Sequence, residues 1–518
     1  MLKKKGRFAK YVEIMDTTLR DGEQTPGVAF SPLEKEQIAR FLLMRAHVDR
    51  IEIGSARVSE GEKEALVSII AGAANKNMEE RMEILGFIDG GKSVDWICDV
   101  GGKVINLLCK GSERHCRVQL KKEPEQHFDL VCKEIEYALK RNLTVNVYLE
   151  DWSGGMRENF GYVYEVTRRI TQYPVARVML PDTLGILTPA EITKYLDWMY
   201  SAFPEIRLDF HGHNDYGLVS SNSLAAVKMG VNGIHTTVNS LGERTGNQSL
   251  CEIAALINDM TDRKTRVVEK KLFDLSQLVQ TFSGKRVAWN KPVTGSDVFT
   301  QTCGVHADGD KKGNLYANAL LPERFSRKRN YALGKLSGKA SIEKNLEMLG
   351  LDLEKDVRDK LLREIVRLGD KKKSVTPEDL PFIIASVLRQ PMDEVMRLDK
   401  YAIHSQQGMA PFARIEINFK GHDLVAESHG DGGYDAFMKA LRKALRQVDV
   451  KLPKLLDYEV RIPPGGATDA LVGATITWDS GGPRPLVTTG LDSDQVYAAM
   501  QATQKMVNIL FADKTNGK

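Results

Sequence analysis

The sequence predicts a mixed α/β protein in three parts: a (β/α)8 TIM barrel at residues 8–285, helical linker subdomains at 286–395 and a small domain of two βββα repeats at 396–518. Short apolar runs alternate with longer segments of helical period throughout the first part, which is typical of β–α units. The alternation stops near residue 286, and three strands followed by a helix are indicated twice after residue 395. A chain of 518 residues is long enough for two or three such domains.

The barrel prediction depends on eight apolar runs and the helices between them. The runs cover residues 11–15, 50–53, 82–87, 104–108, 144–149, 177–180, 208–210 and 233–238. Helical period is found at 32–44, 62–74, 93–100, 124–141, 161–172, 189–203 and 220–229. Two of these helices open with Ser-Pro or Thr-Pro followed by glutamate, an N-terminal capping pattern. Eight β–α units in about 270 residues favour a TIM barrel. An open doubly wound sheet is the alternative, but no G-x-G-x-x-G follows the first run.

The other two parts are predicted from composition and periodicity. Residues 291–330 are rich in Gly, Asp, Lys and Asn, so His306 is expected to lie in a loop. Helical period returns at 338–368, and a turn with a new N-cap is expected at 371–378. In the last part, strands are expected at 397–404, 413–419 and 422–428 before a helix at 433–447, and at 458–462, 470–478 and 485–490 before a helix at 493–511.

The composition is that of a soluble globular protein without an excess of charge. Hydrophobic residues make up 42% and charged residues 27% of the chain. The 73 basic and 69 acidic residues give a net charge of +4, so nothing indicates nucleic-acid binding. No apolar segment follows the basic start, which argues against a secretory signal, and no window reaches the ~18 apolar residues of a membrane span. The six cysteines lack C-x-x-C spacing, as expected of reduced thiols in the cytoplasm.

Two motifs at predicted strand ends supply candidate metal ligands. Residues 208–214 read L-D-F-H-G-H-N, and His211 and His213 point to the same side because they are two residues apart in an extended chain. Asp21, beside Arg20, follows the first apolar run. Two imidazoles and a carboxylate suit a divalent metal such as zinc, manganese or iron. Each side chain also has a structural interpretation, since a strand-end histidine or aspartate can simply cap a turn.

Further polar residues follow later strands, where the reacting groups of TIM barrels lie. Glu150 follows the fifth run, and Asp182 and Thr183 follow the sixth. After the eighth run comes N-S-L-G-E-R-T-G-N, whose glycines allow close approach of the backbone and whose Asn247 offers an oxygen. The alternative is that Glu150 and Asp182 are ordinary loop carboxylates. Polar residues at the ends of several strands are nevertheless hard to explain by packing alone.

Three motifs in order resemble one enzyme family. D-T-T-L-R-D-G-E-Q-T at 16–25, H-G-H-N-D at 211–215 and G-E-R-T-G-N at 242–247 resemble the Claisen-condensing acyl-CoA synthases of the DRE-TIM metallolyase group. This family includes the 2-isopropylmalate, homocitrate and citramalate synthases. The resemblance covers nearly the whole chain, because residues 396–518 are similar to the family's allosteric regulatory domain, including D-Y-E-V-R-I-P-P-G-G at 457–466. Within the family, the chain is most similar to the citramalate synthases that carry this domain.

The resemblance implies roles for individual residues and for a divalent metal ion (Mn, Mg, Zn or Co). The implied metal ligands are Asp21, His211, His213 and Asn247. Arg20 would hold the keto oxygen of a 2-oxo acid, Thr183 its carboxylate, and Glu150 with His306 would move a proton from the methyl group of acetyl-CoA. Asp308, Asn314 and Tyr316 would lie in the acetyl-CoA region. On its own, a histidine among Gly and Asp is more often merely solvated, so the role of His306 depends on the resemblance.

Substrate choice is expected to depend on Leu85, Leu108 and Tyr148, at the ends of the third, fourth and fifth runs. Relatives that take larger 2-oxo acids tend to carry His at the Leu85 position and Ser at the Tyr148 position. Bulky residues here would admit a methyl group and crowd out an isopropyl group, although one methylene alone is worth only ~1–3 kcal/mol. The favoured substrate is therefore pyruvate. The product would be citramalate, which would be used in isoleucine synthesis. The competing interpretation is that these residues are ordinary barrel core.

The similarity of residues 396–518 to the allosteric domain implies feedback by an end product, with isoleucine expected, and a homodimer. The implied effector residues are Tyr434, Asp435, Tyr458, Ile462 and Val472, which could equally be core and turn residues. Three rival functions remain open. The first is a 2-isopropylmalate synthase with leucine feedback, the second an acyl-CoA lyase, and the third a catalytically silent amino-acid-binding protein.

Overall fold

The computed structural model describes residues 8–74, 78–349, 353–370, 375, 379–380, 383–384, 387, 395–461, 472–479, 481 and 485–511. The chain forms two compact units, Met1–Thr300 with Ala317–Asn330, and Gln301–Tyr316 with Tyr331–Lys518. Each unit has hydrophobic clusters of its own. Among the described helices, none combines the length and apolar character that crossing a membrane requires.

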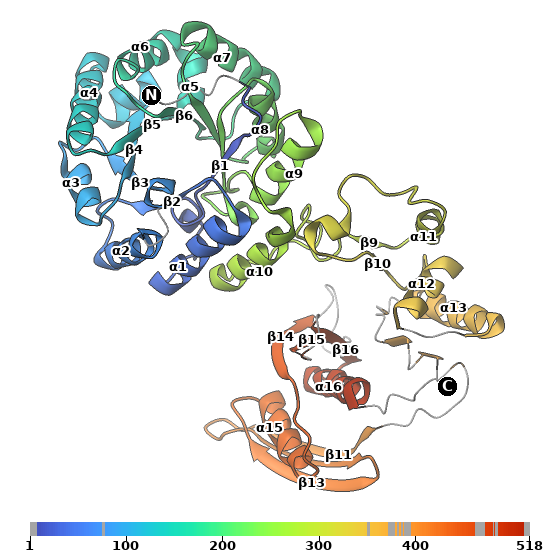
Figure 1. Ribbon diagram of the computed structural model, residues 1–518. Coiled ribbons are helices and arrows are strands. Elements are labelled where there is room, and N and C mark those ends of the chain that lie inside the picture. The colour runs from blue at the N-terminus through green and yellow to red at the C-terminus, as the bar shows by residue number, and fades with distance from the viewer. Residues whose placement is uncertain are drawn as a thin grey trace. The chain divides into compact units, whose positions relative to one another are not determined.

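The first unit is a closed barrel of eight parallel strands in chain order (Figure 1). The barrel closes because the first strand pairs with both the second and the eighth. Its strands are β1 (Glu13–Asp16), β2 (Arg50–Ser55), β3 (Met82–Phe87), β4 (Val104–Lys110), β5 (Thr144–Glu150), β6 (Arg177–Asp182), β7 (Leu208–Gly212) and β8 (Gly233–Thr236). The predicted barrel fold is confirmed.

Helices surround the barrel on its outside (Figure 1). They are α1 (Pro32–Phe41), α2 (Glu60–Ala74), α3 (Lys92–Asp99), α4 (Pro124–Lys140), α5 (Trp152–Glu158), α6 (Phe160–Ile170), α7 (Pro189–Ala202), α8 (Val219–Lys228), α9 (Leu250–Met260) and α10 (Leu272–Ser283). The capping patterns predicted for α1 and α7 form: Ser31 Oγ accepts from the Glu34 backbone while Glu34 accepts from the Ser31 backbone, and Thr188 and Glu191 do the same. Helices α5, α9 and α10 were not among the predicted helices.

The inside of the barrel is layered along the strands. A buried ion network fills the level towards their N-terminal ends, where Arg50 contacts Glu83, Asp209 and Glu13 and Arg177 contacts Glu13 and Asp209. Met15, Leu85 and Met179 lie two residues after Glu13, Glu83 and Arg177 on their strands, and they form an apolar cluster with Tyr148, against which Leu108 packs. This spacing follows from the alternation of side chains along a strand, which sends every second residue inward.

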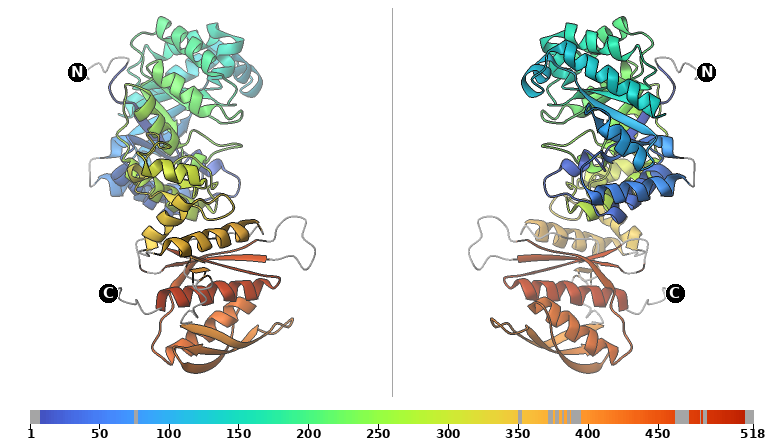
Figure 2. Two further views of the ribbon diagram at one scale, coloured as in Figure 1. Left: turned by 90° about the vertical axis from the view of Figure 1, so that its right-hand side faces the viewer. Right: turned by 90° about the vertical axis from the view of Figure 1, so that its left-hand side faces the viewer.

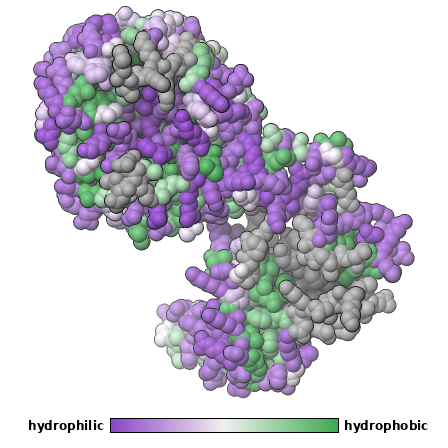
Figure 3. Space-filling model, viewed as in Figure 1, coloured by the Kyte–Doolittle hydropathy of each residue, from purple (hydrophilic) through white to green (hydrophobic). Residues whose placement is uncertain are grey.

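The surface of the barrel unit contrasts with its interior. On the face seen in Figure 3, hydrophilic residues (purple) prevail, and apolar residues (green) form only small scattered patches. Apolar side chains from strands and helices instead gather in one large buried cluster between the barrel and the helices that surround it. Burial of this cluster is the main favourable contribution to the stability of the unit.

The second unit contains two three-stranded antiparallel sheets, each followed by a helix, as predicted. The two helices lie between the sheets (Figure 2) and share one hydrophobic cluster with them. These elements are β11 (Met396–His404), β12 (Phe412–Phe419), β13 (His422–His429), α15 (Gly433–Arg446), β14 (Lys454–Arg461), β15 (Val472–Asp479), β16 (Leu486–Asp492) and α16 (Gln495–Phe511). Trp478 is fully buried and donates its indole N–H to Thr488 Oγ1 at 2.9 Å.

The segment before these sheets contains short elements. They are β9 (Thr300–Gln301), α11 (Gly304–Lys311), β10 (Asn330–Tyr331), α12 (Lys339–Leu349) and α13 (Lys355–Asp370). The two longer helices agree with the predicted helical period at 338–368. The expectation of a loop around His306 is wrong, because His306 lies within α11. Ala307 of that helix is fully buried, so tertiary packing outweighs the low helix propensity of its two glycines. The turn predicted at 371–378 falls, apart from Val375, outside the described residues.

Candidate active site and metal centre

Three ligand-type side chains meet at the C-terminal ends of the barrel strands, here called the barrel mouth. Asp21 Oδ2 lies 3.3 Å from His211 Nε2 and 4.0 Å from His213 Nε2, and the two Nε2 atoms are 3.3 Å apart. All three side chains are buried, and their ligand atoms lie within 4.8 Å of one another. One carboxylate oxygen and two imidazole nitrogens converging in this way fit a divalent metal ion.

Orphaned polar atoms support the same interpretation. Asp21 Oδ1 and Asn247 Oδ1 are buried and have no hydrogen-bond partner within the part of the chain that the structure describes. Asn247 lies opposite His213 in an isolated β-bridge, and its amide donates to Leu241 O at 3.2 Å. Buried oxygens without partners are costly, and a metal ion is a partner that would satisfy them. Asp21, His211, His213 and Asn247 therefore fit the predicted divalent metal.

The loop that carries Asn247 needs glycine. Gly246 has a φ of +81°, and a Cβ atom on it would lie 1.8 Å from Ser240 O. No side chain can be accommodated at that distance, so only glycine allows the loop to fold back. Asn214 N donates to Gly246 O at 2.9 Å, which ties this loop to the segment that carries the histidines.

The charges of the site are set by burial and by close neighbours. Burial opposes ionisation of Asp21, but Arg20 and the two histidines outweigh it and hold its pKa well below the usual range. Burial, with His211 as the next cause, lowers the pKa of His213 to about 4. At neutral pH, Asp21 is therefore an anion and His213 is neutral, as metal ligands must be.

Arg20 is held in place by a residue that the sequence analysis did not single out. Its Nε donates to Glu52 Oε2 at 2.7 Å, and its Nη1 lies 3.3 Å from Asp21 Oδ2. Glu52 is fully buried on β2 and also accepts from Thr17 Oγ1 at 2.7 Å and from Asn106 Nδ2 at 2.8 Å. Burial opposes its ionisation, but Arg20 outweighs this and lowers the pKa of Glu52. The available signal was a lone carboxylate within the apolar run at 50–53.

The three predicted pocket residues lie together. Leu85, Leu108 and Tyr148 belong to the apolar cluster inside the barrel. The Tyr148 ring meets the His211 ring edge-on at 6.0 Å, and the Arg20 guanidinium carbon lies 5.9 Å from its centroid. Its hydroxyl lies 3.0 Å from Nδ1 of His235, whose Nε2 lies 3.5 Å from Asp209. Tyr148 is thus fixed beside Arg20 and the candidate metal ligands, and its role in substrate choice stays a prediction.

Two further predicted residues occupy neighbouring strand ends of the mouth. Glu150 at the end of β5 forms an ion pair with Lys110 at the end of β4. Thr183 Oγ1 accepts from the Asp151 backbone N–H at 2.9 Å, so its own hydroxyl hydrogen stays available to a ligand. Asp182 is fully buried and accepts from the backbone N–H groups of two residues in its own loop, which is the structural role considered for it.

The predicted acetyl-CoA residues lie in the second unit. The rings of His306 and Tyr316 are 4.2 Å apart. Asp308 forms an ion pair with Lys312 at 2.7 Å, and Asn314 has a φ of +56° in the turn that follows α11. His306 is exposed, as is required of a group that meets a ligand. Its part in proton transfer stays a prediction.

Most of the predicted effector residues can be placed within the second unit. The rings of Tyr434 and Tyr458 are 5.0 Å apart, and the Tyr434 hydroxyl lies 2.7 Å from Thr503 Oγ1. Asp435 forms an ion pair with Lys439 at 2.7 Å, one helical turn away. Val472 is buried at the start of β15, and Ile462 lies outside the described residues. The tyrosines are neighbours, whereas the Asp435 pair is an ordinary helix-surface contact.

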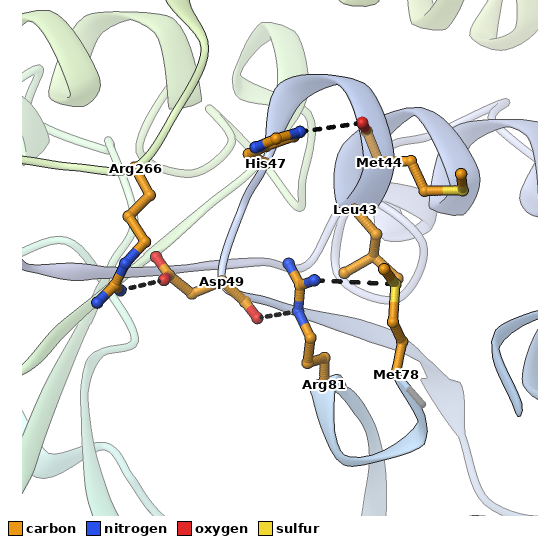
Figure 4. Close-up of a pocket in the computed structure, with 7 residues that line it drawn as sticks. All are labelled: Leu43, Met44, His47, Asp49, Met78, Arg81 and Arg266. Carbon is orange, nitrogen blue, oxygen red and sulfur yellow. Dashed lines mark hydrogen bonds and ion pairs between the residues drawn. The ribbon is translucent and has the colours of Figure 1, made fainter. Parts of the chain in front are cut away.

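A separate cavity of about 370 Å³ lies towards the N-terminal ends of the strands (Figure 4). Its charged groups already have partners: Arg266 pairs with the Asp49 carboxylate at 2.6 Å, and Arg81 donates to the Asp49 carbonyl at 2.9 Å. Reacting groups of TIM barrels lie at the other end of the strands. This cavity is therefore distinct from the candidate active site.

Comparison with known proteins agrees with this geometry. A family model described as HMGL-like matches residues 11–279. The chain belongs to the HMGL-like family. Beyond the HMGL-like region, residues 293–373 match a model described as homocitrate synthase post-HMGL domain-like, and residues 374–511 match the LeuA allosteric (dimerisation) domain.

Full-length relatives of this HMGL-like chain include two named enzymes of Methanocaldococcus jannaschii. The chain is 31% identical to (R)-citramalate synthase CimA, over 96% of this chain and 99% of the relative. It is 32% identical to 2-isopropylmalate synthase, over 97% of this chain and 95% of the relative. The predicted membership of the condensing enzymes is confirmed, whereas the two names differ in the 2-oxo acid used.

Proposed function

We propose that the enzyme condenses acetyl-CoA with pyruvate and hydrolyses the product, so that acetyl-CoA, pyruvate and water give (R)-citramalate and CoA. The observation that carries the proposal is the apolar cluster of Leu85, Leu108 and Tyr148 next to Arg20 and the candidate metal ligands. A wall of this kind suits a methyl substituent and offers little room for a branched one. The relatives named citramalate synthase support the same assignment.

The side chains of the mouth fit the steps of this reaction. Arg20, held by Glu52, would bind the keto oxygen and stabilise the alkoxide that forms on attack. The Thr183 hydroxyl would donate to the carboxylate of pyruvate. Glu150 would act as a general base towards the acetyl methyl group, and the family resemblance implies the same part for His306, which belongs to the second unit. A divalent ion bound by Asp21, His211, His213 and Asn247 would supply Lewis-acid polarisation of the ketone.

We also propose that the enzyme is a homodimer inhibited by isoleucine. The match of residues 374–511 to the LeuA allosteric (dimerisation) domain supports a dimer and allosteric regulation. Isoleucine is the expected effector because citramalate leads to that amino acid. The adjacent Tyr434 and Tyr458 rings offer an apolar surface of the kind that an aliphatic side chain would contact.

One assay tests the substrate and the effector together. CoA release from acetyl-CoA is measured with a thiol reagent for pyruvate, 2-oxobutyrate, 2-oxoisovalerate and 2-oxoglutarate, each with and without isoleucine or leucine. We expect strong preference for pyruvate and inhibition by isoleucine. Preference for 2-oxoisovalerate with leucine inhibition would replace the proposal by 2-isopropylmalate synthase, the second candidate, which the relative of that name supports. No CoA release with any 2-oxo acid would refute both candidate functions.

Opening the pocket should change the substrate preference. In Tyr148→Ser, the space of the lost ring should raise the ratio of kcat/KM for 2-oxobutyrate over pyruvate about tenfold or more, the range expected for one methylene. Tyr148→Phe is the matched control, since it keeps the ring and removes only the hydroxyl that contacts His235. Its ratio should stay within about twofold of the unmodified enzyme. An unchanged ratio in Tyr148→Ser would mean that Tyr148 does not limit substrate size.

A further inference from the structure

Lys110 is a buried cation at the barrel mouth that the reaction scheme above does not use. It ends β4, and Glu150 is its register partner at the end of β5. Its ammonium forms an ion pair with the Glu150 carboxylate, and its side chain is only 10% exposed. Taking an ammonium out of water is costly unless it is well paired. The pair therefore calls for an explanation beyond surface solubility.

The backbone of Lys110 is fixed by side chains from two helices. Its N–H donates to Nε2 of His127 on α4 at 3.1 Å, and its carbonyl accepts from the Tyr162 hydroxyl on α6 at 3.2 Å. Burial is the main cause that lowers the pKa of His127 to about 4, so this imidazole is neutral and its nitrogen can accept. The two helices thus fix the backbone from which the Lys110 side chain extends.

The strand end next to Lys110 is equally constrained. Gly111 N donates to the Glu150 carbonyl at 2.6 Å. A Cβ atom on Gly111 would lie 2.4 Å from Leu149 O, so any residue with a side chain at position 111 would clash with β5. Glycine therefore allows the end of β4 to lie directly against β5. The backbones that carry Lys110 and Glu150 are therefore held against each other, and the ion pair joins two fixed points.

We infer that Lys110 is a positioning residue that holds the Glu150 carboxylate in the orientation required for proton transfer from acetyl-CoA. A glutamate at a strand end has three rotatable side-chain bonds, and a fixed cation selects among its rotamers. Proton transfer needs the base within hydrogen-bond reach of the acidic group, and a misplacement of 1 Å can cost about 100-fold. The inference rests on the proposed function, because it assumes that Glu150 takes part in proton transfer as proposed there.

The test compares Lys110→Met and Lys110→Arg with Lys103→Met in the full-length, metal-loaded enzyme. Lys103 is an exposed lysine just before the other end of β4, so its replacement controls for loss of a lysine beside the same strand. We expect Lys110→Met to lower kcat about 10- to 100-fold, while KM for pyruvate changes less than about threefold. Lys110→Arg, which keeps a cation, should recover part of the loss, and Lys103→Met should behave as the unmodified enzyme.

A double-mutant cycle separates positioning from a structural role. Glu150→Asp keeps a carboxylate but withdraws it from Lys110 by one methylene. If Lys110 acts through Glu150, adding Lys110→Met to Glu150→Asp should lower kcat less than about threefold further. Equal losses in both backgrounds, or a loss accompanied by a lower thermal unfolding midpoint and not recovered by Lys110→Arg, would overturn the inference. An unmodified enzyme without CoA release would instead refute the proposed function, so the two failures are distinguishable.

Discussion

Asp21→Asn should deprive the enzyme of its metal ion and lower kcat about a thousandfold or more. Asp21 supplies the carboxylate of the candidate site, and its Oδ2 lies 3.3 Å from His211 Nε2. Asparagine has a similar shape but no charge, so two imidazoles and two amides would remain to hold a divalent cation, without an anionic ligand. Loss of Lewis-acid stabilisation is worth several kcal/mol, and about 4 kcal/mol corresponds to a thousandfold in rate. Metal content per chain after gel filtration and CoA release are the two measurements.

Asp274→Asn on α10 is the matched control for this substitution. Asp274 is half exposed and pairs only loosely with Lys271 at 3.5 Å, outside the barrel. Its replacement should leave both the metal content and the rate unchanged. Full metal occupancy in Asp21→Asn would contradict the assignment of the site. Loss of activity with retained metal would mean that Asp21 is not a metal ligand but contacts the substrate together with Arg20.

Periodicity was sufficient to predict the barrel because each of its strands and most of its helices satisfy a simple local rule. Strands are apolar runs, and helices α1 and α7 begin with complete capping boxes. Two of the missed helices, α5 and α11, break such rules. Helix α5 contains two adjacent glycines, yet its residues from Trp152 to Met156 are all buried, and α11 contains two glycines and three charged residues. In both, packing against the rest of the unit outweighs weak local propensity.

Some residues of the candidate site could be predicted from the sequence, and others could not. Arg20, Asp21, His211 and His213 follow strand ends in sequence and could be predicted to meet at one end of a barrel. Glu52 and Lys110 could not be assigned, because their partners lie 32 and 40 residues away along the chain. The folding of neighbouring strands, with the loop after β1, into one barrel brings them into contact. In the sequence, Glu52 is the one carboxylate within the run at 50–53 and Lys110 is a charge just after the run at 104–108, and neither pattern indicates the partner residue.

The largest expected effect on stability also comes from ion pairs between residues that lie far apart in sequence. Arg50→Met should lower the free energy of unfolding by about 3–5 kcal/mol, because it removes the cation paired with Glu83 and one of the cations paired with Asp209 and Glu13 inside the barrel. Urea unfolding followed by circular dichroism measures the loss. Arg114→Met is the control: its side chain is 72% exposed and 3.9 Å from Glu158, so its removal should cost less than about 1 kcal/mol.

The pH dependence of the Arg50→Met variant provides an independent check. Burial opposes ionisation of Glu13, but Arg50 and Arg177 outweigh it and lower its pKa from 4.5 to about 2. A carboxyl group with a depressed pKa stabilises the fold above the pKa of the unfolded chain, and this contribution disappears as the pH falls through the folded value. Without Arg50 the folded pKa of Glu13 should rise, so acid unfolding of the variant should begin at higher pH than in the unmodified protein. Coinciding acid transitions would mean that Arg177 and Arg207 suffice to hold the charge of Glu13, and the destabilisation would then have to come from Glu83 and Asp209.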